Sequence, residues 1–321
     1  MAQVARSSAV ATKPDIDALL EVTWKRLEEA RGSARKVVGY FPGGYVPEEL
    51  LYASGVISLC LANGGDARIA DEALSILPNV ICPFARTQVG QMLLKVNPFY
   101  TSLDLLVVPS TCQHMKKIGD VWEYYEGCAV FKLGVPYETD KPFELEYFQS
   151  RILSLKQRLE LLTGNTITND SLRDAILIYN RLRRLLKTIS LARRGPGPSL
   201  TALDFERLSH ASLYVDPVVM VDILEATHER LLKAGRDSSG ATLEGIHPTN
   251  ANRPRLLLAG PNLAIGDYDL IGLISDAGAE VVIEDVFEGM RDYWHTVDPT
   301  GDPIEALAKG YLVDKRPAAF M

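Results

Sequence analysis

The first part of the chain alternates between short apolar runs and stretches with helical periodicity. The apolar runs stand at residues 37–41, 56–61, 105–108 and 129–133. Runs of this kind are typical of strands that are buried on both faces of a parallel sheet, and the helices between them cover those faces. The pattern therefore predicts a doubly wound, Rossmann-like α/β domain.

The middle of the chain changes to the period of amphipathic helices. One apolar face covers residues 145–162 and a second covers residues 172–189, with a short loop between them. Two such helices are expected to form an antiparallel hairpin. The glycines and prolines of residues 194–199 cannot continue a helix. We expect two further helices beyond them, near residues 202–213 and 217–234.

A second α/β pattern begins near the end of the sequence. Strands are predicted at residues 255–260 and 280–283, with a helix at 268–277 between them and a last helix at 303–312. Two strands are too few for an independent sheet. We therefore expect the second α/β domain to be incomplete here and the sequence to be a fragment of a longer chain.

These patterns divide the chain into three parts. Residues 1–140 are predicted to form the first α/β domain, led by an amphipathic helix at 15–31. Residues 141–252 form the helical section, and residues 253–321 begin the second α/β domain.

Composition narrows the class of protein. The chain has 321 residues, of which 47% are apolar, and 41 acidic against 34 basic side chains give a net charge of −7. A general nucleic-acid binder needs a basic surface, so that class is excluded. The sequence shows neither a signal peptide nor an apolar stretch long enough to span a membrane. We expect a cytoplasmic protein, in which four cysteines without paired spacing do not form a disulfide framework.

Two cysteines stand where an α/β protein places reactive groups. Cys112 follows the third predicted strand, and the carboxyl ends of parallel strands are where such folds bind ligands. Cys82 lies in a loop before a helix. Both thiols suit a soft metal or an iron–sulfur cluster, but their wide separation is no metal signature, so buried structural thiols are the alternative. Cys60 and Cys128 lie in or beside strand runs and are expected in the core.

Other polar candidates have two interpretations each. The backbone amides of Gly43 and Gly44 could approach an anion, or the pair could simply form a tight turn. Glu49 could act as a general acid or base, or only contact the helix dipole. His114 is the histidine nearest to the cysteines, and we expect it to be exposed to solvent.

Several segments together carry a resemblance to a known family. They are the opening pattern at residues 38–55, the cysteine segments 82–86 and 104–112, the segment 276–291, and the helix at 302–312. In this order and spacing, over nearly the whole chain, they resemble the 2-hydroxyacyl-CoA dehydratase and benzoyl-CoA reductase family, in particular a D-component-type subunit.

The resemblance implies an oxygen-sensitive iron–sulfur enzyme. Members of the family pair two related subunits, or two copies of one, and three cysteines of a subunit hold a [4Fe–4S] cluster. In the dehydratases an ATP-dependent activator, itself an iron–sulfur protein, supplies an electron. The electron reaches a 2-hydroxyacyl-CoA, and a ketyl radical then expels the hydroxyl group. The same scaffold serves aromatic ring reduction, and the sequence does not reveal the acyl group.

Carried over residue by residue, the resemblance assigns roles to the candidates. Cys82 and Cys112 are the implied cluster ligands, and Glu49 is the implied proton carrier. The residues implied to lie close to the cluster or the acyl-CoA thioester are Tyr45, Arg86, Ser110, Gly43 and Gly44.

The sequence also departs from the family pattern. Gln113 stands where the family commonly has aspartate, and a third cysteine is expected soon after residue 312, where the sequence has Ala318 and Ala319 instead. The ligand is expected either beyond the fragment or replaced by alanine. Two alternatives follow: an accessory subunit without a competent cluster, or a relative whose homodimer carries a double-cubane cluster and reduces small molecules.

Overall fold

The computed structural model describes most of the chain. The residues described are 35–139, 141–195, 197–236, 246–248 and 253–315, together with six positions between 21 and 29. Most of the helix expected at 15–31 lies outside the described residues. Among the helices of the described part, none is both long and apolar enough to cross a membrane.

The first α/β unit is built on a parallel sheet. Its four strands are β1 (Val37–Tyr40), β2 (Ile57–Cys60), β3 (Leu105–Pro109) and β4 (Ala129–Leu133). Their order is β2-β1-β3-β4, and every neighbouring pair is parallel. The predicted α/β fold is therefore confirmed, with each strand at its predicted apolar run.

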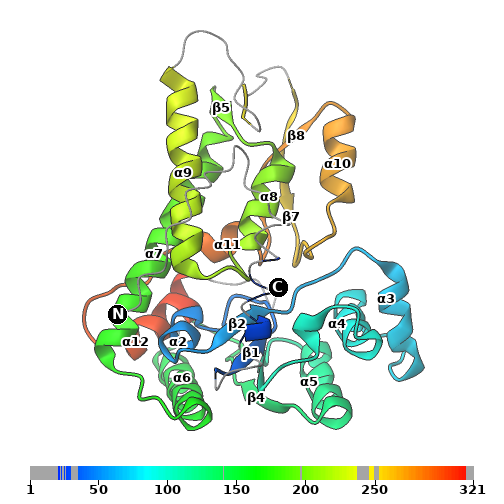
Figure 1. Ribbon diagram of the computed structural model, residues 1–321, viewed down its shortest axis with the longest axis vertical. Helices are drawn as coiled ribbons and strands as arrows, with labels where there is room; N and C mark the ends of the chain where they lie inside the picture. The colour runs from blue at the N-terminus through cyan, green and yellow to red at the C-terminus, as the bar shows by residue number, and fades with distance from the viewer. Residues whose placement is uncertain are drawn as a thin grey trace.

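Side chains alternate between the two faces of this sheet. Val38, Leu105 and Val107 pack into one hydrophobic cluster, whereas Leu106 and Val108 pack into the other. The helices that follow the strands are α2 (Glu48–Ala53), α3 (Ala67–Glu72), α4 (Pro83–Leu94) and α5 (Gln113–Glu126), with short 3₁₀ turns η1 (Ala73–Ser75) and η2 (Pro98–Tyr100). Figure 1 shows α4 and α5 on one side of the sheet and α2 on the other. Burial on both faces explains why the strands are almost continuously apolar.

The helical section comprises α6 (Pro142–Thr163), α7 (Asn169–Ala192), α8 (Ala202–Ala211) and α9 (Pro217–Arg236). The prediction that α6 and α7 pack together as a hairpin is wrong. α6 turns its apolar face, with Phe148 and Ile152, toward the sheet and packs on α12 (Pro303–Lys309), whereas α7 packs on α9 and α2. The apolar face of α6 is used by the sheet, so it is not available to α7.

The second α/β unit contains β7 (Arg255–Ala259) and β8 (Glu280–Asp285), which are parallel and joined through α10 (Asp269–Asp276). A two-stranded antiparallel pair, β5 (Pro198–Ser199) and β6 (His247–Pro248), lies in the same half of the molecule. After α11 (Met290–Tyr293) the chain returns to the first unit (Figure 1). There α12 and the π-helical turn η3 (Gly310–Asp314) bury Leu307, Tyr311 and Leu312 in the core beneath the first sheet.

Close packing of α3 on α4 gives a testable prediction. A Cβ atom added at Gly90 of α4 would lie 1.8 Å from the carbonyl oxygen of Ile69 on α3. The two helices would have to move apart, so we expect Gly90→Ala to lower the free energy of unfolding by about 1–3 kcal/mol or more. Urea denaturation measures this change.

The control is Gly272→Ala in α10, where an added Cβ has nothing within 4 Å. There the substitution should stabilise by roughly 0.5–1 kcal/mol, because alanine is the better helix former. Equal effects of the two substitutions would contradict the close approach at Gly90.

Candidate functional site

Cys82 and Cys112 each stand at the beginning of a helix. Cys82 is the N-cap of α4 and its sulfur accepts a hydrogen bond from the Ala85 amide at 3.5 Å. Cys112 is the N-cap of α5 and its sulfur accepts from the Met115 amide at 3.4 Å. The amides and the positive end of the helix dipole favour the thiolate form, which is the form that binds metals.

His114 connects the two cysteine segments. Its Nδ1 accepts a hydrogen bond from the Cys82 backbone amide at 3.1 Å, so the N-terminal ends of α4 and α5 are adjacent. The side chain is half-buried, not exposed as expected. Burial raises the pKa of the Cys82 thiol, and the nearby Cys112 raises it further, whereas the Ala85 amide and Arg86 lower it. The two thiols are therefore close enough to influence each other's charge.

The sulfur positions fit part of an iron–sulfur site. Two thiols with N–H···S hydrogen bonds, one half-buried and one exposed, are suitable soft ligands. Within the part of the chain that the structure describes, no group of three or more metal-binding side chains comes together. The described residues thus fit two ligand positions of a cluster.

Gly43, Gly44 and Ser110 lie at the same edge of the sheet as Cys112. Gly43 and Gly44 follow β1 with φ angles of 137° and 74°, which favour glycine. A Cβ atom at Gly43 would lie 3.9 Å from Thr111, the residue before Cys112. β2 is added on one side of β1, whereas β3 and β4 are added on the other, so the strand order reverses between β1 and β3. Ligands of open α/β sheets bind at such a switch point.

Arg86 lies one turn into α4 beyond Cys82. Its partner is Asp71 on α3, at 3.6 Å, and the Arg86 side chain is only 14% exposed. The Nε atom of Arg86 is buried and has no hydrogen-bond partner in the described structure. The guanidinium is close enough to Cys82 to lower the pKa of its thiol, and an arginine at this place suits an anionic ligand.

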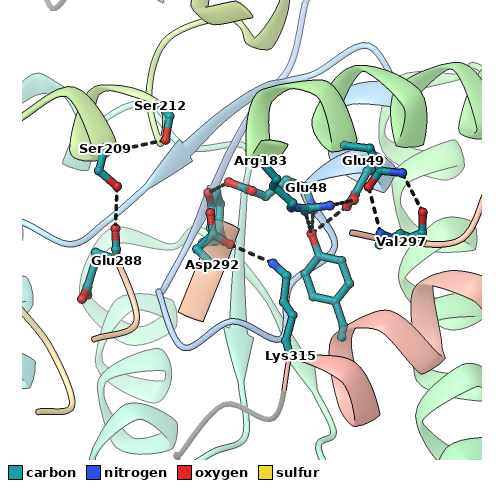
Figure 2. Close-up of polar contacts among 12 residues, drawn as sticks. Glu48, Glu49, Arg183, Ser209, Ser212, Glu288, Asp292, Val297 and Lys315 are labelled. Atoms are coloured by element: carbon teal, nitrogen blue, oxygen red, sulfur yellow. Dashed lines mark hydrogen bonds and ion pairs between the residues drawn. The ribbon is translucent and has the colours of Figure 1, made fainter. Parts of the chain in front are cut away.

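Tyr45 and Glu49 lie in the core behind this edge. Tyr45 packs edge to face on Phe148 of α6, and burial raises the pKa of its hydroxyl. Glu49 is fully buried: one oxygen accepts from Arg183 at 2.6 Å and the other from the Tyr311 hydroxyl at 2.6 Å. Figure 2 shows Arg183 beside Glu49. These contacts bind Glu49 in an ion pair within the molecule.

A cavity of about 20 Å³ lies at the carboxyl end of β1, beside Gly43 and Gly44. Glu48 and Glu288 line it, and the sequence analysis singled out neither. For Glu48 the available signal was its place beside Glu49 at a helix start, which also fits a simple dipole contact. For Glu288 the signal was its place just after a strand, β8, where parallel sheets bind ligands.

Comparisons with known proteins agree on one family. Residues 44–321 match the family model of the 2-hydroxyglutaryl-CoA dehydratase D-component. The chain is 26% identical to a benzoyl-CoA reductase subunit of Thauera aromatica over 93% of its own length and 72% of that protein. It is 26% identical to the putative dehydratase subunit YjiM of Escherichia coli (strain K12), over 84% of its length and 67% of that protein. It is 23% identical to the (R)-phenyllactyl-CoA dehydratase beta subunit of Clostridium sporogenes, over 87% of its length and 70% of that protein.

Proposed function

Because the chain belongs to the family of the 2-hydroxyglutaryl-CoA dehydratase D-component, we propose that it is a subunit of an iron–sulfur enzyme acting on acyl-CoA thioesters. The proposed reaction is either radical dehydration of a 2-hydroxyacyl-CoA or reduction of an aromatic acyl-CoA. Two relatives are named a benzoyl-CoA reductase subunit and an (R)-phenyllactyl-CoA dehydratase subunit, which supports these two classes. The observation that supports this is the placement of two N-cap cysteines side by side at the switch point of the sheet.

Cys82 and Cys112 would hold two positions of a [4Fe–4S] cluster, which when bound supplies a low-potential electron. The amides of Ala85 and Met115 favour negative charge on the two sulfurs, and Arg86 offsets part of it. The two amides and Arg86 would therefore stabilise the thiolate form of the ligands from the positions that they already occupy.

The remaining residues of the edge suit a thioester ligand. Gly43 and Gly44 carry no side chain that would block this turn, so their amides would be able to approach a carbonyl or phosphate oxygen. The positive charge of Arg86 would attract an anionic group, and Ser110 directly follows β3 at the same edge. Glu49 would serve as a proton carrier from the buried side, with Arg183 and Tyr311 fixing the position of its carboxyl group. Tyr45 would lie close to the cluster or the thioester.

The proposed assembly includes a related second subunit, or a second copy of this chain, and an ATP-dependent activator that delivers electrons. The cytoplasm is the compartment in which such reducing chemistry would proceed. The three parts proposed from the sequence, residues 1–140, 141–252 and 253–321, would place the reactive edge between the two α/β units.

A second candidate function is that of an accessory subunit without a competent cluster. The observation in its favour is that Ala318 and Ala319 stand in the segment where the family commonly has its third cysteine. The third alternative is a relative of the reductases that carry a double-cubane cluster. It would be distinguished by an iron content greater than that of one [4Fe–4S] cluster for each chain.

Turnover tests the first proposal. The chain is purified without oxygen together with the related second subunit, then supplied with activator, ATP and a series of 2-hydroxyacyl-CoA and aromatic acyl-CoA compounds. We expect conversion of one class, which Cys82→Ala abolishes because a ligand is lost. The control is Cys128→Ala, since Cys128 is buried before β4, at the other end of the sheet's strands.

Full iron content without conversion of either class would refute the proposed activity. A stable complex in which the second subunit alone holds iron and turns over substrate would favour the accessory role.

A further inference from the structure

The cavity at the carboxyl end of β1 is bounded by both α/β units. Glu48 and Cys60 come from the first unit, and Glu288 and Asp292 from the second. Its volume of about 20 Å³ is enough for a single water molecule. It opens beside the Gly43–Gly44 turn, at the edge that carries the candidate site.

Several acids in and near this cavity have a cation of their own. Glu49 pairs with Arg183 at 2.6 Å, and Asp292 pairs with Lys315 at 2.8 Å (Figure 2). Farther along β8, Glu284 pairs with Arg193. Each carboxylate in these pairs has its charge balanced within hydrogen-bonding distance.

Glu48 and Glu288 differ from these acids. Both are at least nine-tenths buried, and neither has an ion-pair partner among the described residues. A Glu48 oxygen makes a short hydrogen bond with the Tyr40 hydroxyl. The two oxygens of Glu288 accept from the Asn262 side chain at 2.8 Å and from the Leu263 amide at 3.2 Å. Neutral donors do not balance a buried charge, so such a group takes up a proton instead.

The charged groups near Glu48 and Glu288 do not cancel the effect of burial, which favours the protonated form of both carboxyl groups. Burial, aided by Asp292, raises the pKa of Glu48 to about 7, against the opposing effects of Lys315, Tyr40 and Arg183. Burial raises the pKa of Glu288 to about 7 as well, although Asn262 and His210 of α8 lower it. The other titratable groups close by are un-ionised at neutral pH because burial raises the pKa of each; they are Cys60, Tyr179, Tyr214 and Tyr311.

We propose that this cavity is a proton store: the Glu48 and Glu288 carboxyl groups that line it keep their protons up to near-neutral pH, and Glu48 can give its proton to a group that enters beside Gly43 and Gly44. The store itself is independent of the proposed function. Its use rests on that function, because a hydroxyl group that departs from a substrate needs one proton to leave as water. Glu48 would then remain as a carboxylate until it takes a proton from solvent. Glu49 does not line this cavity; its carboxyl group contacts Arg183 and the Tyr311 hydroxyl instead.

The store is tested on the full chain through the pH dependence of unfolding. Folded Glu48 and Glu288 keep their protons to higher pH than the unfolded chain does, so they stabilise the fold at acidic pH. That stability is lost as the pH rises through about 7. Between about pH 5 and about pH 8, each acid should raise the unfolding equilibrium constant more than tenfold. Glu48→Gln and Glu288→Gln should each flatten this response and raise Tm at the higher pH.

Two controls separate the store from general effects of burial. Glu49→Gln should lower Tm at both pH values, because it leaves Arg183 without its anion. Glu123→Gln, on the exposed face of α5, should change neither Tm nor its pH response. Glutamine variants with the wild-type pH response would overturn the proposal.

Infrared spectroscopy gives a second readout that needs no stable variant. Wild-type protein near neutral pH should show the carbonyl stretch of protonated carboxyl groups, and this absorption should disappear on titration to about pH 9. Its absence at neutral pH would overturn the proposal even if both glutamine variants failed to fold. Loss of turnover with an intact carboxyl absorption would instead contradict the proposed function alone.

Discussion

Replacing Arg183 with methionine is expected to lower the free energy of unfolding by about 3–5 kcal/mol. The Arg183 side chain is fully buried, with Nη1 donating to Glu49 at 2.6 Å and Nη2 to the Tyr311 hydroxyl at 2.7 Å. Methionine fills a similar space but leaves the Glu49 charge buried without a partner. Guanidinium chloride denaturation of the two proteins measures the difference.

Arg181→Met on the same helix is the matched control. Arg181 pairs with Glu225 of α9 at the surface, where the Arg181 side chain is 62% exposed. Exposed ion pairs contribute little, so its loss should cost about 1 kcal/mol or less. If the Arg183 and Arg181 variants were equally stable, the buried network around Glu49 would not hold α2, α7 and η3 together as described.

Substitution of either Cys82 or Cys112 by alanine is expected to remove all cluster iron from the chain. After reconstitution without oxygen, wild-type protein should contain about four iron and four sulfide ions for each chain, as a [4Fe–4S] cluster requires. Each sulfur accepts an amide hydrogen bond at the N-terminus of a helix, and losing one would leave a single N-cap sulfur to hold the cluster. Iron and acid-labile sulfide analysis provides the measurement.

Cys128→Ala should retain the wild-type iron content, because Cys128 lies away from this edge and its sulfur contacts only the protein core. Iron retained in the Cys82 variant would exclude that residue as a ligand. A wild-type chain that binds no iron after reconstitution would favour the accessory-subunit function.

The first sheet could be predicted from sequence because its signal is local. The central strands β1 and β3 are buried on both faces, so each appears as a continuous apolar run such as Leu105–Pro109. The edge strand β4 is still largely apolar, although Lys132 is exposed. The periodicity of α6 and α7 correctly predicted two helices. It did not show which neighbour each apolar face would contact, and the predicted hairpin failed for that reason.

The residues of the candidate site also fall into two groups: those that a local sequence pattern predicted, and those that only long-range contacts bring together. Cys82, Cys112 and the Gly43–Gly44 turn follow strands or begin helices, and their nearness follows from the rule that parallel strands end at one edge. Arg183 contacts Glu49 across 134 positions of sequence, a pairing that no local pattern indicates. Glu48 and Glu288 likewise meet at one cavity only because the second α/β unit folds against the first. Nothing in the sequence around either glutamate indicates that meeting.

The return of α12 to the first unit has a consequence for how this molecule can be divided. Residues 303–312 follow the second α/β unit in sequence, yet Leu307, Tyr311 and Leu312 complete the core beneath the first sheet. A truncated protein that ended before α12 would leave the apolar side chains of α6 that contact α12 exposed to solvent. The two halves should therefore melt as one cooperative block, and a protease cut between β8 and α12 should leave both pieces attached until denaturant separates them.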